Sequence, residues 1–364
     1  MSDVTPKRTA PLRRGWTTGA CATAAAKAAY IALVTGSFPD PVEIALPGGG
    51  RPAFALAREQ READSATAGV VKDAGDDPDV THGALILATV RGGPPGSGVS
   101  FRAGPGVGTV TKPGLPLAVG EPAINPVPRR MMRDAIAEAA ASLGQTGDAI
   151  IEISVAGGEE IAKRTWNPRL GIVGGLSILG TTGIVIPYSC SAWIHSIQRG
   201  IDVARAAGHR HVAGATGATS EAAVVRRYGL PETALIDMGD FAGGMLKYLR
   251  RHPVPRLTIA GGFAKLSKLA QGHLDLHSGR SQIDLRWLAS IAGESGAAQP
   301  VVAAIASANT GLEALRLARA AGVPLADAVA ARARATALGI LEQAGIAVDV
   351  LVVDREGRPV GQAG

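Results

Sequence analysis

Four carboxylates crowd the stretch VVKDAGDDPDVTHG, residues 70–83, and form the sharpest acidic cluster of the sequence: Asp73, Asp76, Asp77 and Asp79. Because like charges at this spacing repel one another, the cluster requires a cationic partner. It could hold a metal ion, act as a general base, or bind a hydroxyl or ammonium group. The spacing does not match an EF-hand loop, and Asx turns around Pro78 are the competing structural interpretation. We take Asp73 and Asp77 as candidate proton acceptors.

Arginines gather in the stretch PVPRRMMRDAIAE, residues 126–138, in the first turns of a predicted helix. The helix dipole disfavours cations there by roughly a few tenths of a kcal/mol each. Either Asp134 and Glu138 pair with them on a solvated face, or the arginines and the helix N-terminus together bind carboxylates or phosphates. Two further arginines precede another helix start. The candidates for an anion clamp are Arg13, Arg14, Arg129, Arg130 and Arg133.

The stretch GHLDLHSGRSQID, residues 272–284, holds two histidines four positions apart. On a helix, His273 and His277 would share a face and could bind a metal ion. No third ligand is evident, and the flanking glycines indicate a loop. We therefore predict a polar loop that faces the substrate through His277, Ser278 and Arg280, and no metal site. His277 is the third candidate proton acceptor.

Thr-Gly pairs recur before predicted helices, at Thr18-Gly19, Thr182-Gly183, Thr216-Gly217 and Thr310-Gly311. A hydroxyl followed by glycine at a helix start leaves backbone N–H groups that can point at an anion. Ordinary helix capping explains each pair equally well. Three such turns on one sheet edge would favour a shared pocket.

The elements that position these residues change in character near residue 166. Before it, strands follow strands at 42–46, 53–59, 66–74, 84–90, 99–104 and 149–157, with helices from Thr17 to about Val34 and from Pro128 to Gly144. This order predicts an α+β domain with a largely antiparallel sheet. After it, strands at 176–179, 211–217, 234–239, 256–262, 301–311 and 348–354 alternate with helices, which predicts a Rossmann-like parallel sheet. We expect a basic arm at 1–14, an α+β domain at 15–165 and an α/β domain at 166–364.

The composition excludes several classes of protein. The chain has 364 residues, 46% of them hydrophobic and only 4% aromatic, and a net charge of +6. A basic protein with few aromatic residues suits a small polyanionic partner better than nucleic acid, which is bound by stacking. Two cysteines cannot build a disulfide framework. No signal-peptide pattern and no run of about 18 apolar residues is evident, so we expect a cytoplasmic protein outside the membrane.

Several long stretches also resemble one family when they are taken together and in order. They are GWTTGACATAAAKAA, VVKDAGDDPDVTHG, GVGTVTKPGLP, GEPAINPVPRRM, NPRLGIVGGLSILGTTGIV and the segment from MGDFAGG to GRSQID. Across about residues 13–354 they resemble the cobalt-precorrin-5B C1-methyltransferase family of cobalamin biosynthesis. The resemblance implies transfer of a methyl group from S-adenosylmethionine to C1 of cobalt-precorrin-5B, giving cobalt-precorrin-6A.

This resemblance gives the candidate residues roles. The substrate is a flat ring with a fringe of carboxylates. We expect these carboxylates to be bound by the five arginines, by the turn Thr17, Thr18 and Gly19, and by the loop residues Ser278 and Arg280. The donor needs a carboxylate for its ribose, for which Asp240 is the first choice, with an N-cap as the competing role. Its amino-acid end is assigned to Gly180, Thr181, Thr182, Gly183, Thr216 and Gly217.

Two other functions fit the same residues. A nucleotide-dependent oxidoreductase or kinase would use the α/β half, and a non-catalytic tetrapyrrole carrier would use the same basic slot. The G-x-S-x-G, GxxxxGK[ST] and strict G-x-G-x-x-G patterns do not occur. The sequence leaves open the preference for a cobalt-loaded substrate, the proton acceptor and whether copies of the chain assemble into an oligomer.

Overall fold

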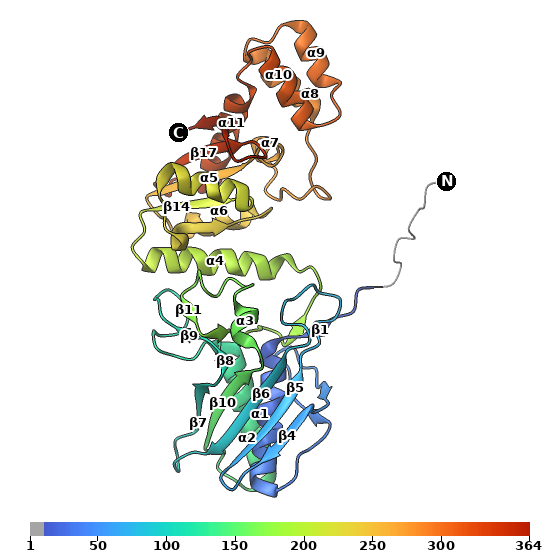
Figure 1. Cartoon of the computed structure of the whole chain (residues 1–364), viewed down its shortest axis with the longest axis vertical. Helices are drawn as coiled ribbons and strands as arrows, with labels where there is room; N and C mark the ends of the chain where they lie inside the picture. Colours follow the sequence, from blue (N-terminus) through green and yellow to red (C-terminus); the bar gives the residue numbers. More distant parts are fainter. Residues whose placement is uncertain (1–10) are drawn as a thin grey trace, which may run out of the picture. The chain divides into compact units, whose positions relative to one another are not determined.

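The structure is a computed structural model that describes residues 11–364 (Figure 1). Most of the predicted basic arm, 1–14, therefore lies outside the described residues. The chain divides into two compact units, one ending at Cys190 and one covering Ser191–Gly364. The division comes later than the predicted boundary after residue 165, because strands from 172–185 pair with the first unit.

The first unit is built on a five-stranded sheet with the order β4-β5-β6-β10-β7. Its strands are β4 (Arg58–Arg61), β5 (Ser65–Val71), β6 (Leu85–Gly92), β7 (Val99–Ala103) and β10 (Ala149–Val155). All neighbours are antiparallel except β10 and β7. The sheet is thus largely antiparallel, as the run of successive strands predicted.

Helix α1 (Thr18–Thr35) packs against β5 and β6 and against α2 (Pro126–Leu143). Thr17 caps its start by accepting a hydrogen bond from the Ala20 amide, and Gly36 ends it with φ 85°. By length and composition alone α1 is a candidate membrane span, although sequence reasoning found no long apolar run there. Because 78% of that window is buried inside the protein, its small side chains serve close packing between sheet and helix.

Short paired strands complete the first unit. β1 (Gly15–Trp16) pairs with β13 (Ile184–Val185), and β2 (Val42–Glu43) pairs with β3 (Ala53–Phe54). The glycine- and proline-rich segment forms β8 (Gly106–Val107) and β9 (Thr109–Val110). These pair with β12 (Gly175–Leu176) and β11 (Ile172–Val173), and α3 (Gly158–Ala162) lies beside them. These pairings keep residues 166–190 in the first unit.

The second unit is built on a five-stranded sheet with the order β15-β14-β16-β17-β18. The strands are β14 (His211–Ala215), β15 (Leu235–Asp237), β16 (Arg256–Gly262), β17 (Ala347–Val353) and β18 (Pro359–Ala363). The first four are parallel, and β18 is antiparallel to β17. The predicted last strand is therefore followed by one more, which turns back along it.

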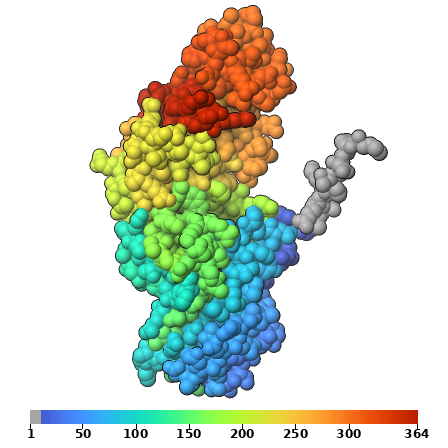
Figure 2. Space-filling model, in the orientation of Figure 1, coloured from blue at the N-terminus to red at the C-terminus, as the bar shows by residue number. Residues whose placement is uncertain are grey.

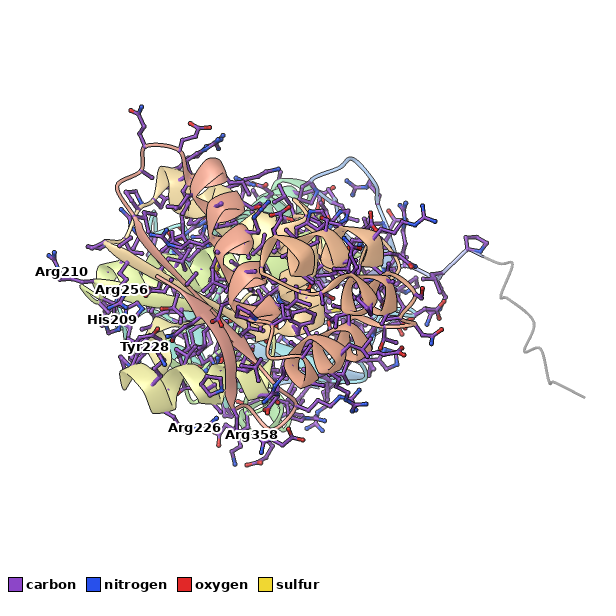
Figure 3. All side chains as sticks on the ribbon, turned by 90° about the horizontal axis from the view of Figure 1, so that it is seen from above. His209, Arg210, Arg226, Tyr228, Arg256 and Arg358 are labelled. Atoms are coloured by element: carbon purple, nitrogen blue, oxygen red, sulfur yellow. The ribbon has the colours of Figure 1, made fainter. Side chains whose placement is uncertain are left out.

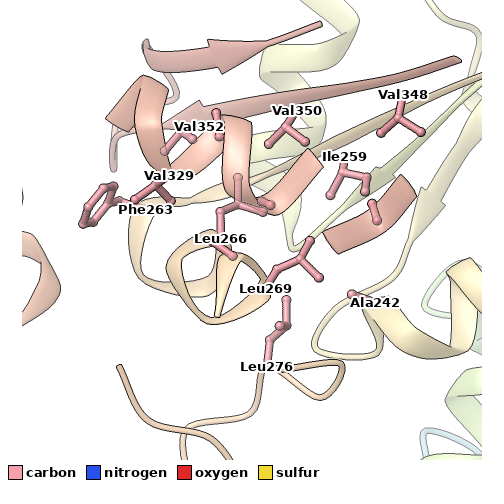
Figure 4. Packing of buried hydrophobic residues seen from close by; sticks show 14 of the residues in the cluster. Ala242, Ile259, Phe263, Leu266, Leu269, Leu276, Val329, Val348, Val350 and Val352 are labelled. Carbon is pink, nitrogen blue, oxygen red and sulfur yellow. The ribbon is translucent and has the colours of Figure 1, made fainter. Parts of the chain in front are cut away.

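Helices cover both faces of this sheet. On one face α5 (Ala218–Tyr228) packs on Ala213, Ala260 and Leu351. On the other face α6 (Ala242–Arg251), α7 (Phe263–Ala270) and α11 (Leu325–Leu341) pack on Ile259, Val348 and Val350, as Figure 4 shows for the residues it labels. The buried residues along β17 alternate between the two faces, since side chains of a strand point to opposite sides in turn.

The remaining helices of the unit are α4 (Cys190–Ala206), the short 3₁₀ turn η1 (Glu232–Ala234), α8 (Leu285–Glu294), α9 (Gln299–Ala306) and α10 (Gly311–Ala320). Their atoms from α8 to α10 form the orange surface in Figure 2. The predicted strand at 301–311 is wrong, because most of that run belongs to α9. A short apolar run rich in alanine does not distinguish a strand from a helix, and Pro300 in the first turn favours the helix.

Candidate functional site

The acidic cluster receives its cationic partners from the chain itself. The Arg13 guanidinium pairs with the Asp73 carboxylate, and the Arg13 amide donates to Asp76 Oδ2 at 2.8 Å. The hydrogen bond from Arg13, helped by the Gly75 amide, lowers the pKa of Asp73 to about 2. Arg13, predicted to bind substrate, is thus engaged with a predicted proton acceptor, and Asp73 is a weak base near neutral pH.

The other half of the cluster holds the loop together. Lys72, whose side chain is 1% exposed, donates to Asp79 at 2.6 Å, and Thr81 donates to the other oxygen of that carboxylate. Burial opposes ionisation of Asp79, but the charge and hydrogen bond of Lys72, together with the hydrogen bonds from Thr81, outweigh it and lower the pKa of Asp79. Asp77 accepts a hydrogen bond from the Tyr188 amide at 2.7 Å. Within residues 11–364 no group of three or more His, Cys, Asp and Glu side chains suits a metal ion.

The predicted Thr-Gly turns at 17–19 and 180–183 meet each other in the first unit. The Thr17 amide donates to Gly183 O at 3.0 Å, and the Gly19 amide donates to Leu179 O at 2.9 Å. A Cβ at Gly180 would lie 2.4 Å from Thr17 Oγ1, so only glycine fits there. These turn groups therefore satisfy one another. The expectation that Thr182-Gly183 opens a helix is wrong, since β13 follows it, whereas Thr181 and Thr182 remain exposed.

The arginines of α2 divide into an anchored one and two exposed ones. Arg129 donates to Ile124 O and Pro122 O and pairs with Glu121 at 2.8 Å, so it fixes the segment before the helix. Arg130 and Arg133 are exposed, as is Arg14. The Arg133 guanidinium lies 5.1 Å from the ring centroid of Phe101, an arrangement that holds the cation over an aromatic face.

The second unit brings Thr216, Gly217 and Asp240 to one edge of its sheet. Thr216 and Gly217 follow β14, and Asp240 follows β15, at the carboxyl ends of neighbouring parallel strands. Asp240 Oδ1 is buried and accepts no hydrogen bond. The competing N-cap role is wrong, because α6 begins at Ala242 after Phe241, without a capping side chain. Lys265, which sequence reasoning missed, lies 3.1 Å from Asp240 Oδ1.

The loop at 272–284 lies against the same edge. The Leu276 amide donates to Asp240 O at 2.8 Å, and the buried Lys268 donates to Leu276 O at 2.8 Å. Leu276 itself enters the core below α7 (Figure 4). Next to it, His277 Nδ1 accepts a hydrogen bond from the Gly279 amide, and Arg280 pairs with Asp275 at 2.6 Å. The predicted loop conformation is correct, and the loop meets the segment after β15 at two points, Leu276 on Asp240 and the Arg280 guanidinium 5.7 Å from the ring centroid of Phe241.

The second unit also carries a group of basic residues that sequence reasoning missed. His209, Arg210, Arg226, Tyr228, Arg256 and Arg358 lie toward one side of the unit in Figure 3. The Tyr228 ring lies 5.5 Å from the Arg227 guanidinium and 5.3 Å from that of Arg256. Arg256 also pairs with Asp349 at 2.7 Å. The pattern RRY at 226–228 supplies only part of this group, because the other members lie in distant segments: before β14, at the start of β16 and before β18.

The buried cysteine of the first unit is unsuited to act as a nucleophile. Cys21 is buried in α1, and burial raises the pKa of its thiol to about 12. A thiol with so high a pKa stays protonated and is a poor nucleophile near neutral pH.

Comparison with known proteins identifies the family. The model of the CbiD family matches residues 5–187, and the model of the CbiD C-terminal domain matches residues 275–364. The chain belongs to the CbiD family.

Curated relatives of this CbiD chain carry one name. A protein called cobalt-precorrin-5B C(1)-methyltransferase from Paramagnetospirillum magneticum is 67% identical, over 97% of this chain and 98% of that protein. Proteins of the same name from Rhodospirillum rubrum and Bradyrhizobium sp. are 65% and 63% identical, over 97% and 100% of this chain and 98% and 96% of their own length.

A crystal structure described as a cobalamin biosynthesis protein (cbiD) from Archaeoglobus fulgidus is 27% identical to this chain. It matches 69% of this chain and 77% of that one, with a TM-score of 0.40.

In this CbiD chain the predicted residues Asp73 and Asp77 fall in the first family match, and His277 falls in the C-terminal-domain match. Thr216 and Asp240 lie between the two matches.

Proposed function

We propose that this chain is a cobalt-precorrin-5B C1-methyltransferase that uses S-adenosylmethionine and yields cobalt-precorrin-6A in cobalamin biosynthesis. The observation that carries the proposal is the 67% identity, over 97% of the chain, to a relative of that name. The wider match of the chain to the CbiD family model and its C-terminal-domain model supports the same conclusion.

The donor supplies a methyl group that its sulfonium already activates, so the protein needs to orient two molecules and exclude water. A site for such a donor needs a free hydrogen-bond acceptor for its hydroxyl groups. The Asp240 carboxylate fits this need, since its Oδ1 is buried and accepts no hydrogen bond. We propose that Asp240, Thr216 and Gly217 contribute to donor binding. The turn at 180–183 is already packed on Thr17, which argues against a direct role for Gly180 and Gly183.

For the substrate, the exposed arginines are the stronger candidates for carboxylate binding. Arg14, Arg130 and Arg133 are exposed, whereas Arg13 and Arg129 pair with carboxylates of the chain. A guanidinium can bind each substrate carboxylate through two parallel hydrogen bonds. Among the proposed proton acceptors we retain Asp77 and His277, because the pKa of Asp73, about 2, makes that residue too weak a base.

We further propose that the second unit is a Rossmann-like variant and that the protein acts in the cytoplasm, with a corrinoid precursor as its small-molecule partner. The four parallel strands covered by helices on both faces support the first point. Assembly into a homo-oligomer is compatible with this function and is not required by it.

The test is incubation of the purified protein with cobalt-precorrin-5B and S-adenosylmethionine that carries a labelled methyl group. We expect label in the corrinoid, at C1 by NMR, together with one equivalent of S-adenosylhomocysteine. A carrier would change the corrinoid spectrum without incorporating label. Thermal stabilisation by NAD or ATP but not by S-adenosylhomocysteine would instead favour an oxidoreductase or kinase and would refute the methyltransferase.

A further inference from the structure

The parallel sheet of the second unit reverses its winding at β14. β14 comes first in the chain, β15 pairs with one side of it, and β16 pairs with the other side. In open α/β sheets, ligands bind outside the carboxyl ends of the strands at the position where the strand order reverses. In this unit that position lies between the ends of β14 and β16. Gly217, which follows β14, and Gly262, the last residue of β16, face open space, since an added Cβ would meet no atom within 4 Å at either one.

Lys265 connects the strand ends that meet there. It lies in the first turn of α7, directly after β16. Its Nζ donates to the backbone oxygen of Thr216, after β14, at 3.0 Å. The same Nζ lies 3.1 Å from Oδ1 of Asp240, after β15. One ammonium group therefore holds the ends of three neighbouring strands together.

The contact between Lys265 and Asp240 is an ion pair without hydrogen-bond geometry. Asp240 Oδ1 is buried and accepts no hydrogen bond, even though the ammonium is close. The Asp240 side chain as a whole is 23% exposed although Oδ1 is buried, so the exposed part of this side chain lies away from Oδ1. Buried polar atoms without a hydrogen bond are rare in folded proteins and call for an explanation. A carboxylate that is oriented by charge alone keeps its lone pairs for a ligand.

We propose that Lys265 is a positioning residue of the methyl-donor site. It holds the Asp240 carboxylate and the end of β14 in the arrangement that accepts the hydroxyl groups of the donor's ribose. This inference rests on the proposed function, which supplies a ribose-bearing donor. It locates the donor site within the second unit and adds a residue that no Thr-Gly pattern pointed to.

The charge of Lys265 is the property that matters here. Methionine at this position preserves much of the length and removes the ammonium, which leaves the Asp240 carboxylate without a counter-charge and Thr216 O without its donor. Arginine preserves the charge with a different geometry and should restore part of the function. Lys247, exposed on α6 in the same unit, provides a matched control.

The experiment measures binding of S-adenosylhomocysteine to the full chain by calorimetry. We expect Lys265→Met to weaken binding by about tenfold to a hundredfold, the range seen when a residue that orients a binding group is lost. Lys265→Arg should recover part of the loss, and Lys247→Met should bind like the wild type. In labelled methyl transfer, Lys265→Met should raise the KM for the donor and leave the KM for the corrinoid unchanged.

A double-mutant cycle separates positioning from general destabilisation. In an Asp240→Asn background, Lys265→Met should cost much less affinity than it does in the wild type, because the residue acts through that carboxylate. An equal loss in both backgrounds would overturn the inference, as would wild-type affinity in Lys265→Met. If Lys265→Met does not fold, the same comparison is made with Lys265→Arg.

Donor binding and methyl transfer by the wild-type protein test the proposed function separately from the role of Lys265. Wild-type protein that binds S-adenosylhomocysteine but transfers no methyl group would refute the methyltransferase and leave the role of Lys265 intact. Wild-type protein that transfers the methyl group, with unchanged donor binding in Lys265→Met, would refute the role of Lys265 alone.

Discussion

Replacement of Lys72 by methionine is expected to destabilise the first unit strongly and in a pH-dependent way. The Lys72 side chain is 1% exposed and its Nζ lies 2.6 Å from Asp79 Oδ2. Removal of one partner from a buried ion pair costs about 3–5 kcal/mol, because the other charge stays buried alone. The Asp79 side chain is 25% exposed, so water reaches part of the carboxylate. We therefore expect a smaller loss, about 2–3 kcal/mol at pH 7.

The sign of the pH dependence follows from Asp79. Burial opposes its ionisation, yet the charge and hydrogen bond of Lys72 lower its pKa. A carboxylate with a lowered folded-state pKa contributes stability above its unfolded pKa, about 3.9, and loses that contribution as the pH falls. The difference between wild type and Lys72→Met should therefore be largest near neutral pH and shrink below about pH 4, where Asp79 takes up a proton.

The assay is hydrogen–deuterium exchange of peptides from β5 and β6 in increasing urea, since it reports on the first unit alone. Lys163→Met is the control: that lysine is 69% exposed and pairs with an exposed glutamate, so its loss should cost less than about 0.5 kcal/mol. The double variant Lys72→Met, Asp79→Asn should be more stable than Lys72→Met alone. A Lys72→Met variant that loses no stability, or loses the same amount at pH 7 and pH 4, would refute this account of the pair.

Four further predictions concern packing, substrate charge, the anchoring role of Arg129 and acid stability. Ala25→Leu should lower the free energy of unfolding, measured by chemical denaturation, by about 1–3 kcal/mol, because this fully buried residue belongs to α1, which packs on α2 and the sheet. The control Ala137→Leu, on the exposed face of α2, should lower it little. Arg130→Ala should raise the KM for the corrinoid more at low than at high salt, and an unchanged KM at low salt would remove this arginine from the substrate site. Arg129→Ala should mainly lower stability, because that side chain holds residues 121–124. Finally, the Arg13–Asp73 pair contributes stability above the unfolded pKa of Asp73, about 3.9, and loses it as the pH falls toward the folded pKa of about 2. Asp73→Asn should therefore make the free energy of unfolding depend less steeply on pH in that window. An unchanged pH dependence would show that this exposed pair contributes nothing.

Local signals in the sequence predicted the main elements well. Thr17 and Gly36 bound α1, and Gly144 ends α2 with φ 65°, as expected for caps of these residue types. The strands β5, β6, β7 and β10 lie where successive apolar runs indicated. The errors include α9, where an alanine-rich run fits either structure, and β18, whose polar sequence PVGQA carries little strand pattern. They also include the run at 176–179, which was expected in the parallel sheet and instead lies in the first unit, where β12 pairs with β8.

The candidate site was predicted only in part, since its partners come from distant positions. The loop at 272–284 was recognised from its glycines, and Asp240 from its place after a strand. The pairing of Arg13 with Asp73, 60 positions away, turned two proposed functional residues into an ion pair. Lys265 carries no pattern of its own, because a lysine in the first turn of a helix is common on protein surfaces.

The sequence by itself determined the class of each half, the ends of the principal helices and the family to which the chain belongs. These features depend on residues that are close in the chain, through caps, periodicity and long motifs. Only the tertiary structure decided that Arg13 and Lys72 pair with Asp73 and Asp79 of the acidic cluster, and that Lys265 meets Asp240 at the ends of three strands. Charges from distant segments are brought within a few ångströms by packing of the sheet and its helices, and that proximity is what sets their chemistry.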